Sequence, residues 1–390
     1  MTGFAARIDA ATPPGRDRGI DALRALAILG VVGGHWLVTA LVADSGTVRG
    51  ASPLAAMPHL VPVSWVFQTL AVFFLVGGVV AAGSWTSAQK GGVPYGRWVG
   101  GRLARLFRPV AAVLTVWTLA AGAMLAAGVG EPTVRALGKL VWSPLWFLLV
   151  FAALTALTPL VARLHPLWPL VVVLHVDLVR LGLGGPRELG WVNVVAGWLV
   201  PYCLGALVAR GGLRGRAGRW GLLLGGASAA AGLVLWAGYP AAMVGVPGGR
   251  FSNLDPPSLA AVAFGLAQCG AALLLLGPLR RVLRRPAAWA AVAVVNLAAM
   301  TVFLWHQTAM IIVTTTALAL TDGPLPGLHT VPDDTGWVVA RLLWLPVFAL
   351  ALLGCWAVFR GYEQSGRRTD GGSLVVRESA PARKGRVRRA

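Results

Sequence analysis

Long runs of apolar residues recur along the chain, and clusters of Arg, Pro and Gly separate them. A helix needs about 20 mostly apolar residues to cross the hydrocarbon core of a bilayer. The pattern therefore predicts an all-α polytopic membrane protein with about ten transmembrane helices. The predicted spans are residues 20–43, 62–84, 109–129, 142–162, 166–183, 190–209, 219–238, 258–278, 287–320 and 336–360. The fifth span is short, and the ninth is long enough to tilt, break or extend beyond the membrane.

Composition agrees with this class, because 57% of the residues are hydrophobic and only 12% are charged. A soluble domain carries about 25% charged residues. The net charge of +20 would also suit a nucleic-acid-binding protein, but the basic residues are concentrated in alternate loops. This distribution follows the positive-inside rule. We therefore expect a multi-pass protein of the cell membrane, with both termini cytoplasmic, membrane lipids as its surroundings and no nucleic-acid partner.

The chain divides into three parts by composition. Residues 1–19 form a cytoplasmic N-terminal segment, residues 20–361 a single membrane domain, and residues 362–390 a basic tail that we expect to be disordered at the cytoplasmic face. The tail either binds anionic lipid or only fixes the topology. Protein partners are not indicated. The three cysteines fall within predicted helices, so no disulfide framework is expected.

Three ionisable residues interrupt the first apolar run: Asp21, Arg24 and His35. Charged groups inside a membrane span are costly, so they indicate a functional site. Arg24 and His35 are eleven residues apart, which is about three turns plus 20° and a rise of about 16 Å. The two side chains should therefore share a face, with Arg24 near the cytoplasmic surface and His35 near mid-membrane. A neutral imidazole there is suited to take a proton from a hydroxyl.

Two other interpretations of this helix stay open. His35 can instead bond across a helix contact, and Arg24 can extend its guanidinium to the interface. Gly33 and Gly34 remove side-chain bulk beside His35, so another helix or a ligand can approach closely.

The run from Ile20 to His35 resembles the opening of the acyltransferase family 3 membrane proteins, whose hallmark is an Arg, ten intervening residues and a His. Three later segments are similar in order and position. Residues 73–78 resemble the family's Phe-Phe-x-x-Ser-Gly segment with Gly77 in place of Ser, residues 102–109 resemble its basic loop before helix three, and residues 301–306 resemble its Ser-x-Tyr-Leu-x-His segment with Thr301 and Phe303 substituted.

The resemblance implies transfer of an acyl group, often acetyl, from cytoplasmic acyl-CoA to a hydroxyl of an extracytoplasmic carbohydrate or a glycolipid or other lipid-linked acceptor. It places the catalytic residues at His35, as general base or transient acyl acceptor, and at Arg24. Acyl-CoA, with acetyl-CoA expected, is then a donor substrate, and no permanently bound cofactor is expected. The Gly at position 77 argues against a Ser nucleophile.

Further polar residues complete the predicted site. Arg102, Arg105 and Arg108 recur every third residue and either bind the phosphates of coenzyme A or only fix the topology. His306 orients a substrate or His35, or bonds between helices. Asp21 is assigned to substrate binding with these residues.

Four further ionisable residues lie outside the predicted site. His59, His165 and His329 are expected to be solvated, and Arg341 is expected to extend outward from its helix.

Other chemistries find little support in the sequence. It has no phosphate-binding glycine loop, no Cys/His zinc spacing and no Ser-centred elbow, so no metal site is predicted. The competing functional class is a transporter or flippase of a glycan or lipid, with the His and Arg lining its path.

Overall fold

The computed structural model describes residues 2–44, 46–246 and 251–368, and 77% of the structure is helical. The prediction of an all-α polytopic membrane protein is confirmed. The helices are α1 (Thr2–Ala10), α2 (Arg18–Val38), α3 (Pro53–Ala56), α4 (Val61–Ser64), α5 (Leu70–Lys90), α6 (Tyr95–Ala126), α7 (Glu131–Trp142), α8 (Trp146–Ala156), α9 (Thr158–Val161), α10 (Leu167–Asp177), α11 (Gly190–Ala209), α12 (Arg216–Trp236), α13 (Leu259–Val282), α14 (Pro286–Leu297), α15 (Ala299–Leu320) and α16 (Thr335–Arg368). Short 3-10 turns and one π-helical turn join several of them.

Within the described residues, nine helical runs are long and apolar enough to cross a membrane. They match nine of the predicted spans, although most boundaries differ. The remaining one, predicted at 166–183, is the 11-residue helix α10 followed by the π-helical turn Leu178–Gly182. Helix α10 ends among the ionisable residues His175, Asp177 and Arg180. The predicted tail, residues 362–390, falls largely outside the described residues, apart from the last turns of α16.

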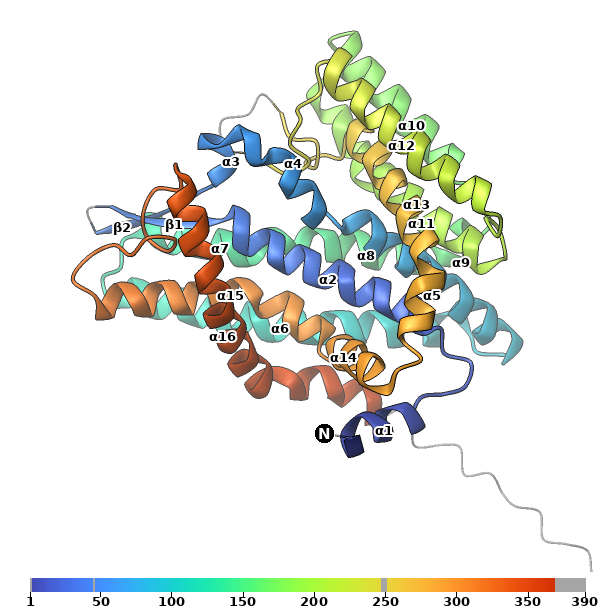
Figure 1. The fold of residues 1–390 in the computed structure, drawn as a ribbon, viewed down its shortest axis with the longest axis horizontal. Coiled ribbons are helices and arrows are strands. Elements are labelled where there is room, and N and C mark those ends of the chain that lie inside the picture. The colour runs from blue at the N-terminus through green and yellow to red at the C-terminus, as the bar shows by residue number, and fades with distance from the viewer. Residues whose placement is uncertain (1, 45, 247–250, 369–390) are drawn as a thin grey trace, which may run out of the picture.

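The first predicted span, 20–43, extends too far at its C-terminal end. Helix α2 ends at Val38, and the chain turns into strand β1 (Ala40–Asp44), which pairs antiparallel with β2 (Thr47–Ala51). The strand β1 is a short apolar run, and hydropathy alone does not distinguish such a run from helix. The hairpin lies at the opposite end of α2 from α1 (Figure 1).

The predicted ninth span, 287–320, breaks into α14 and α15. The break lies at Ala298, whose φ of −100° and ψ of 4° are not helical. Helix α14 has only 12 residues, so α15 makes the crossing. The break places the last turn of α14 beside the start of α2, where α14 and α2 are in contact.

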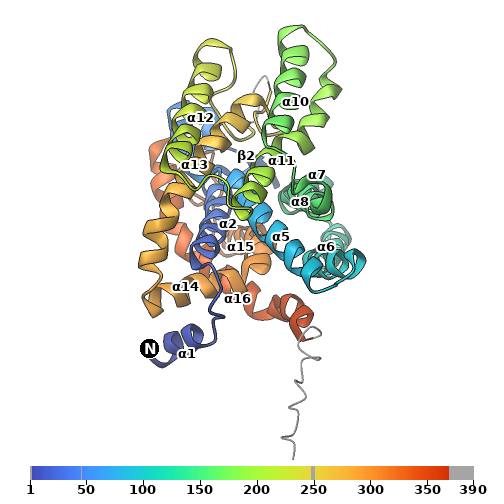
Figure 2. The same cartoon turned by 90° about the vertical axis from the view of Figure 1, so that its right-hand side faces the viewer.

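Glycines allow the closest helix contact, between α5 and α11. A Cβ atom on Gly78 would collide with the carbonyl of Tyr202, and one on Gly205 would collide with the carbonyl of Leu75. Small residues let two backbones approach in this way within membranes, where packing drives helix association. The main core gathers around α2, α5, α6, α8, α11 and α15, whereas α12 packs mainly on α13 (Figure 2).

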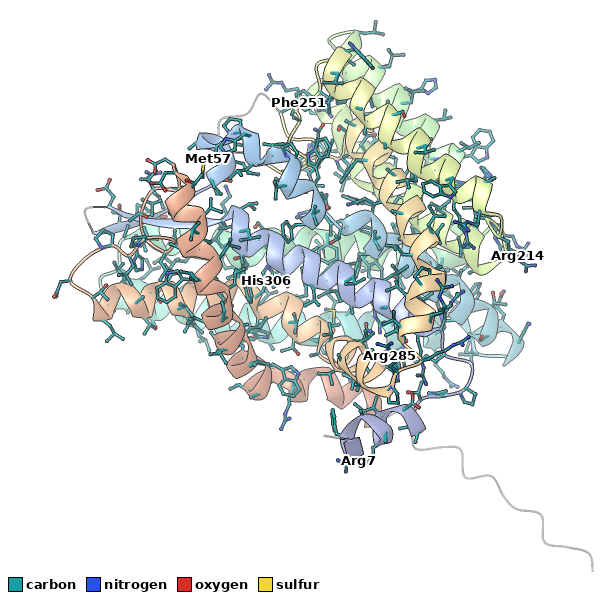
Figure 3. All side chains as sticks on the ribbon, in the orientation of Figure 1. Arg7, Met57, Arg214, Phe251, Arg285 and His306 are labelled. Carbon is teal, nitrogen blue, oxygen red and sulfur yellow. The ribbon has the colours of Figure 1, made fainter. Side chains whose placement is uncertain are left out.

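Basic side chains gather at one end of the molecule. Figure 3 places Arg214 and Arg285 on the side where α2 begins and Arg7 at the lower edge, while Met57 and Phe251 lie on the other side. Residue numbers increase in the same direction on both sides of the contact between α2 and the α14–α15 pair: Asp21 bonds Asn296, and Trp36 bonds His306. Helix α15 therefore runs parallel to α2, and both lead away from the basic end.

Candidate active site

Helix α2 has two opposite faces. Leu26 and Leu29 are 52% and 46% exposed, and they lie about 200° and 140° around the helix from Arg24. Arg24 and His35 share the face that is turned toward α14 and α15. The apolar side chains thus point to the surrounding lipid, and the ionisable ones point into the bundle.

His35 is half-buried, and its ring is held from α15. The Nδ1 atom lies 3.1 Å from the side-chain amide nitrogen of Gln307, and the rings of His35 and His306 are 5.1 Å apart between centroids, tilted by 50°. Gly33 and Gly34 face the ring and Cβ of Phe67, so a 3-10 turn before α5 occupies the space that these glycines leave. The imidazole therefore has one nitrogen engaged, and the residue as a whole is less buried than His306.

His306 has a different environment from His35. It is 1% exposed, and its Nδ1 donates a hydrogen bond to the carbonyl of Phe303 at 2.5 Å. In a neutral imidazole this leaves Nε2 as an acceptor, and that atom is buried without a hydrogen-bond partner among the residues that the structure describes. Trp36 Nε1 donates to the backbone carbonyl of His306 at 2.9 Å, which ties α2 to α15 at this level. His306 is a buried neighbour, and His35 is the more accessible imidazole of the two.

Arg24 lies three turns closer to the basic end and is held on two sides. Its Nε donates to Asn296 Oδ1 at 2.6 Å, and its NH2 lies 3.2 Å from Asp21 Oδ1. Asp21 also pairs with Arg16, at 2.5 Å between Oδ2 and Nε. The carboxylate is thus shared between two guanidinium groups, and it orients Arg24, whose side chain remains 30% exposed.

The arginines predicted to bind phosphate are on helix α6 and not in a loop before it, because α6 begins at Tyr95. Arg102 is half-buried, and its guanidinium carbon lies 5.1 Å from the Trp98 ring centre. Arg105 and Arg108 are exposed. Successive steps of three residues rotate by about 300°, so the three side chains spread over about 120° of the helix. The structure therefore distinguishes Arg102 from the other two.

A cavity of about 550 Å³ opens at the same end of the molecule. Its lining includes Arg163, Arg210 and Trp85. The Trp85 ring packs on Trp98 at 5.1 Å, so the cavity and Arg102 lie on either side of one aromatic pair.

Arg341 does not extend outward as predicted. It is 1% exposed and donates to the carbonyls of Trp36, Thr39 and Gly327. Two of these carbonyls belong to the end of α2, where they have no partner within the helix. Burying the guanidinium satisfies them, which explains why it stays inside.

His329 is also buried, at 1% exposure, and not solvated as predicted. Its Nε2 lies 2.7 Å from the Thr314 carbonyl and its Nδ1 accepts from the Leu325 amide. It fixes the loop that precedes α16. His59 and His165 are exposed, in agreement with the prediction.

The segment at residues 73–78 packs helices together. Phe74 stacks on Trp198 at 5.0 Å, and a Cβ on Gly77 would collide with the Phe151 ring. Phe147, from the same aromatic cluster, meets Phe303 edge to face at 4.7 Å. This cluster supports the turn of α15 that carries His306.

A second polar cluster lies between α10, α11 and α13. Buried Asp177 accepts hydrogen bonds from Asn193, Tyr239 and the backbone amide of Leu259. Burial and the neighbouring carboxylate raise the pKa of Tyr239. These bonds join three helices, which accounts for the polar residues at the end of α10. No group of three or more His, Cys, Asp or Glu side chains suited to a metal ion occurs in the described part of the chain.

Sequence reasoning missed three residues that hold the ionisable face of α2: Asn296, Gln307 and Arg341. Their partners in α2 are 272 or more residues away in sequence. Each of the three is a polar residue within an apolar run, which was the available signal, but this pattern does not identify the residue that it contacts.

Comparison with known proteins gives one family. The family model described as an acyltransferase domain, that of acyltransferase family 3, matches residues 17–360. No curated protein and no solved structure matches the chain. Because the family match covers nearly the whole chain, the protein belongs to acyltransferase family 3 and is a membrane acyltransferase.

Proposed function

We propose that this protein is an O-acyltransferase that moves an acyl group, acetyl in the first instance, from acyl-CoA to a hydroxyl of a carbohydrate or lipid-linked acceptor across the cell membrane. One observation supports the proposal most directly. The half-buried imidazole of His35 is held through one nitrogen inside the bundle, and Arg24 lies on the same face toward the basic end. A base and an anchoring cation thus lie on one face of α2.

The reaction needs one proton to be carried. His35 takes the proton from the acceptor hydroxyl, and the hydroxyl oxygen bonds to the thioester carbonyl carbon. The tetrahedral intermediate then breaks its carbon–sulfur bond. The leaving thiolate of coenzyme A takes the proton back from the imidazolium, so an ester and a free thiol result. Of the two imidazoles, His35 has this role because His306 is 1% exposed.

The donor would enter from the basic end. Guanidinium groups bind phosphate oxygens in bidentate fashion. Arg102 beside Trp98, together with Arg163 and Arg210 at the neighbouring cavity, offers such groups at one end of the bundle. By the positive-inside rule that end faces the cytoplasm, which contains acyl-CoA, and the acceptor approaches from the hairpin end.

The test compares purified His35→Ala with wild type and with His59→Ala, which removes an exposed histidine. Proteoliposomes receive acetyl-CoA and a cell-surface glycan extract, and release of the thiol and acetylation of the glycan are measured together. His35→Ala should lose about 10²–10⁴-fold in rate, and His59→Ala should match wild type. Retained activity in His35→Ala would refute the assigned base. Glycan movement without thiol release would favour the transporter or flippase.

A further inference from the structure

Two buried carboxamides face Arg24 and His35 of α2. Asn296 Oδ1 accepts from Arg24 Nε at 2.6 Å, and the Gln307 side-chain amide lies 3.1 Å from His35 Nδ1. Asn296 and Gln307 are eleven residues apart, as are Arg24 and His35. Because α15 runs parallel to α2 and the last turn of α14 lies beside the start of α2, the pairs Asn296–Arg24 and Gln307–His35 follow one another in the same order along the contact.

Burying these two amides is costly unless their polar atoms form hydrogen bonds. Asn296 is 6% exposed and Gln307 is 2% exposed, and a buried amide without hydrogen-bond partners destabilises a protein. Each uses one side-chain atom on the ionisable face of α2. An apolar residue would pack against α2 without that cost.

The Asn296 amide has a fixed orientation. Its nitrogen donates to the carbonyls of Asp21 at 2.8 Å and Val292 at 3.1 Å, so its oxygen is the atom that meets Arg24. The acceptor and the Asp21 carboxylate together aim the guanidinium.

The Gln307 amide has two possible orientations. With its nitrogen toward His35, it donates to Nδ1, and the ring carries its hydrogen on Nε2. With its oxygen toward His35, it accepts from Nδ1–H, and Nε2 keeps a free lone pair. Only the second arrangement leaves the ring able to take a proton at Nε2. In the structure the nitrogen lies toward Nδ1, and Oε1 is buried without a partner among the described residues, so exchanging the two amide atoms brings the oxygen to His35.

We propose that Asn296 and Gln307 are positioning residues for acyl transfer: Asn296 aims the Arg24 guanidinium, and Gln307 accepts from His35 Nδ1–H and so selects the tautomer that acts as base. This inference rests on the proposed function. His306, whose ring faces His35 at 5.1 Å, is the neighbouring titratable group and is kept constant in the test.

The test uses purified enzyme with acetyl-CoA and glycan extract, and it separates kcat from the KM for acetyl-CoA. Gln307→Leu should lower kcat about 10–100-fold, the size of effect found when the partner that orients a metal-bound histidine is removed, with KM unchanged. Gln307→Glu can accept but not donate, so it should restore kcat to within about tenfold of wild type and shift the acid limb of the pH–rate profile. Asn296→Leu should mainly raise KM, since Arg24 lies on the donor side.

Matched controls are available on other helices. Gln268→Leu removes a glutamine that bonds the Gln68 carbonyl, and Asn193→Leu removes the buried partner of Asp177. Both should keep the kcat and KM of wild type. Should the Leu variants fail to insert, Gln307→Glu and Asn296→Asp carry the test, because both keep a polar side chain of the same length.

The outcomes separate this inference from the proposed function. Retained activity in His35→Ala would show that His35 is not the base, which counts against the proposed function itself. An inactive His35→Ala with wild-type kinetics in Gln307→Leu and Asn296→Leu overturns this inference alone. Equal loss in Gln307→Glu and Gln307→Leu overturns the tautomer assignment, because it shows that the amide must donate.

Discussion

Arg341 allows a quantitative test of how the end of α2 is held. The guanidinium donates to Trp36 O at 2.6 Å, to Gly327 O at 2.8 Å and to Thr39 O, and its NH2 lies 2.9 Å from Met310 Sδ. No ion pair joins it to an acidic side chain within the described ranges. Partial charges at the C-terminal end of a helix favour a cation there.

Arg341→Lys isolates the geometry of these bonds, because the charge and its burial are kept. The lysine ammonium has no planar fork, so we expect it to reach one of the three carbonyls. Two lost hydrogen bonds to a charged donor, at about 1.5–3 kcal/mol each, lower the free energy of unfolding by about 3–6 kcal/mol. Since Trp36 follows His35, the acyl-transfer rate should fall as well.

Titration with a denaturing detergent measures this free energy. Arg360→Lys is the control, because Arg360 lies on the same helix, is exposed and stacks on Trp356; it should change stability by less than about 0.5 kcal/mol. A loss below about 1 kcal/mol in Arg341→Lys would refute the idea that this side chain anchors α2.

Two further predictions concern the basic end. Arg102→Gln should raise the KM for acetyl-CoA about tenfold, and Arg105→Gln should raise it much less, because of the two only Arg102 is half-buried on an aromatic ring. Unchanged donor affinity after Arg102, Arg105 and Arg108 are all replaced by Gln would exclude these arginines from phosphate binding. Asp17 caps α2 and pairs with Arg280. Burial favours the neutral form of its carboxyl group. The hydrogen bond and charge of Arg280 and the amides of Gly19 and Ile20 outweigh burial, so they lower the pKa of Asp17 below 3.8. Its stabilisation is therefore present above pH 3.8 and is lost as the pH falls through the lowered value, so melting temperature should drop there in wild type and vary less in Asp17→Asn.

Hydropathy predicted the helices well because lipid leaves backbone groups no other partners than those within the helix. The same argument marked the run at 287–320 as long enough to tilt, break or extend beyond the membrane, but it did not show that the run breaks at Ala298. The period of 3.6 residues also put Arg24 and His35 on one face of α2.

Partners far apart in sequence could not be predicted in this way. Arg341 was expected to extend outward, since a lone cation in an apolar helix usually does so. It stays inside because three carbonyls converge on it from α2 and from the loop before α16. His329 stays buried for the same reason, through the Thr314 carbonyl. The residue types in the sequence do not show which backbone carbonyls accept these hydrogen bonds.

These contacts together restrict how the enzyme can move. Helix α2 is held at Arg24 by Asn296, at His35 by Gln307 and at its end by Arg341. Rotating α2 by one residue, about 100°, would break all three contacts and turn lipid-facing leucines toward the bundle. The cost of those buried bonds far exceeds thermal energy. The ionisable face of α2 therefore stays fixed, and under the proposed function both substrates would reach His35 along paths that the neighbouring helices open.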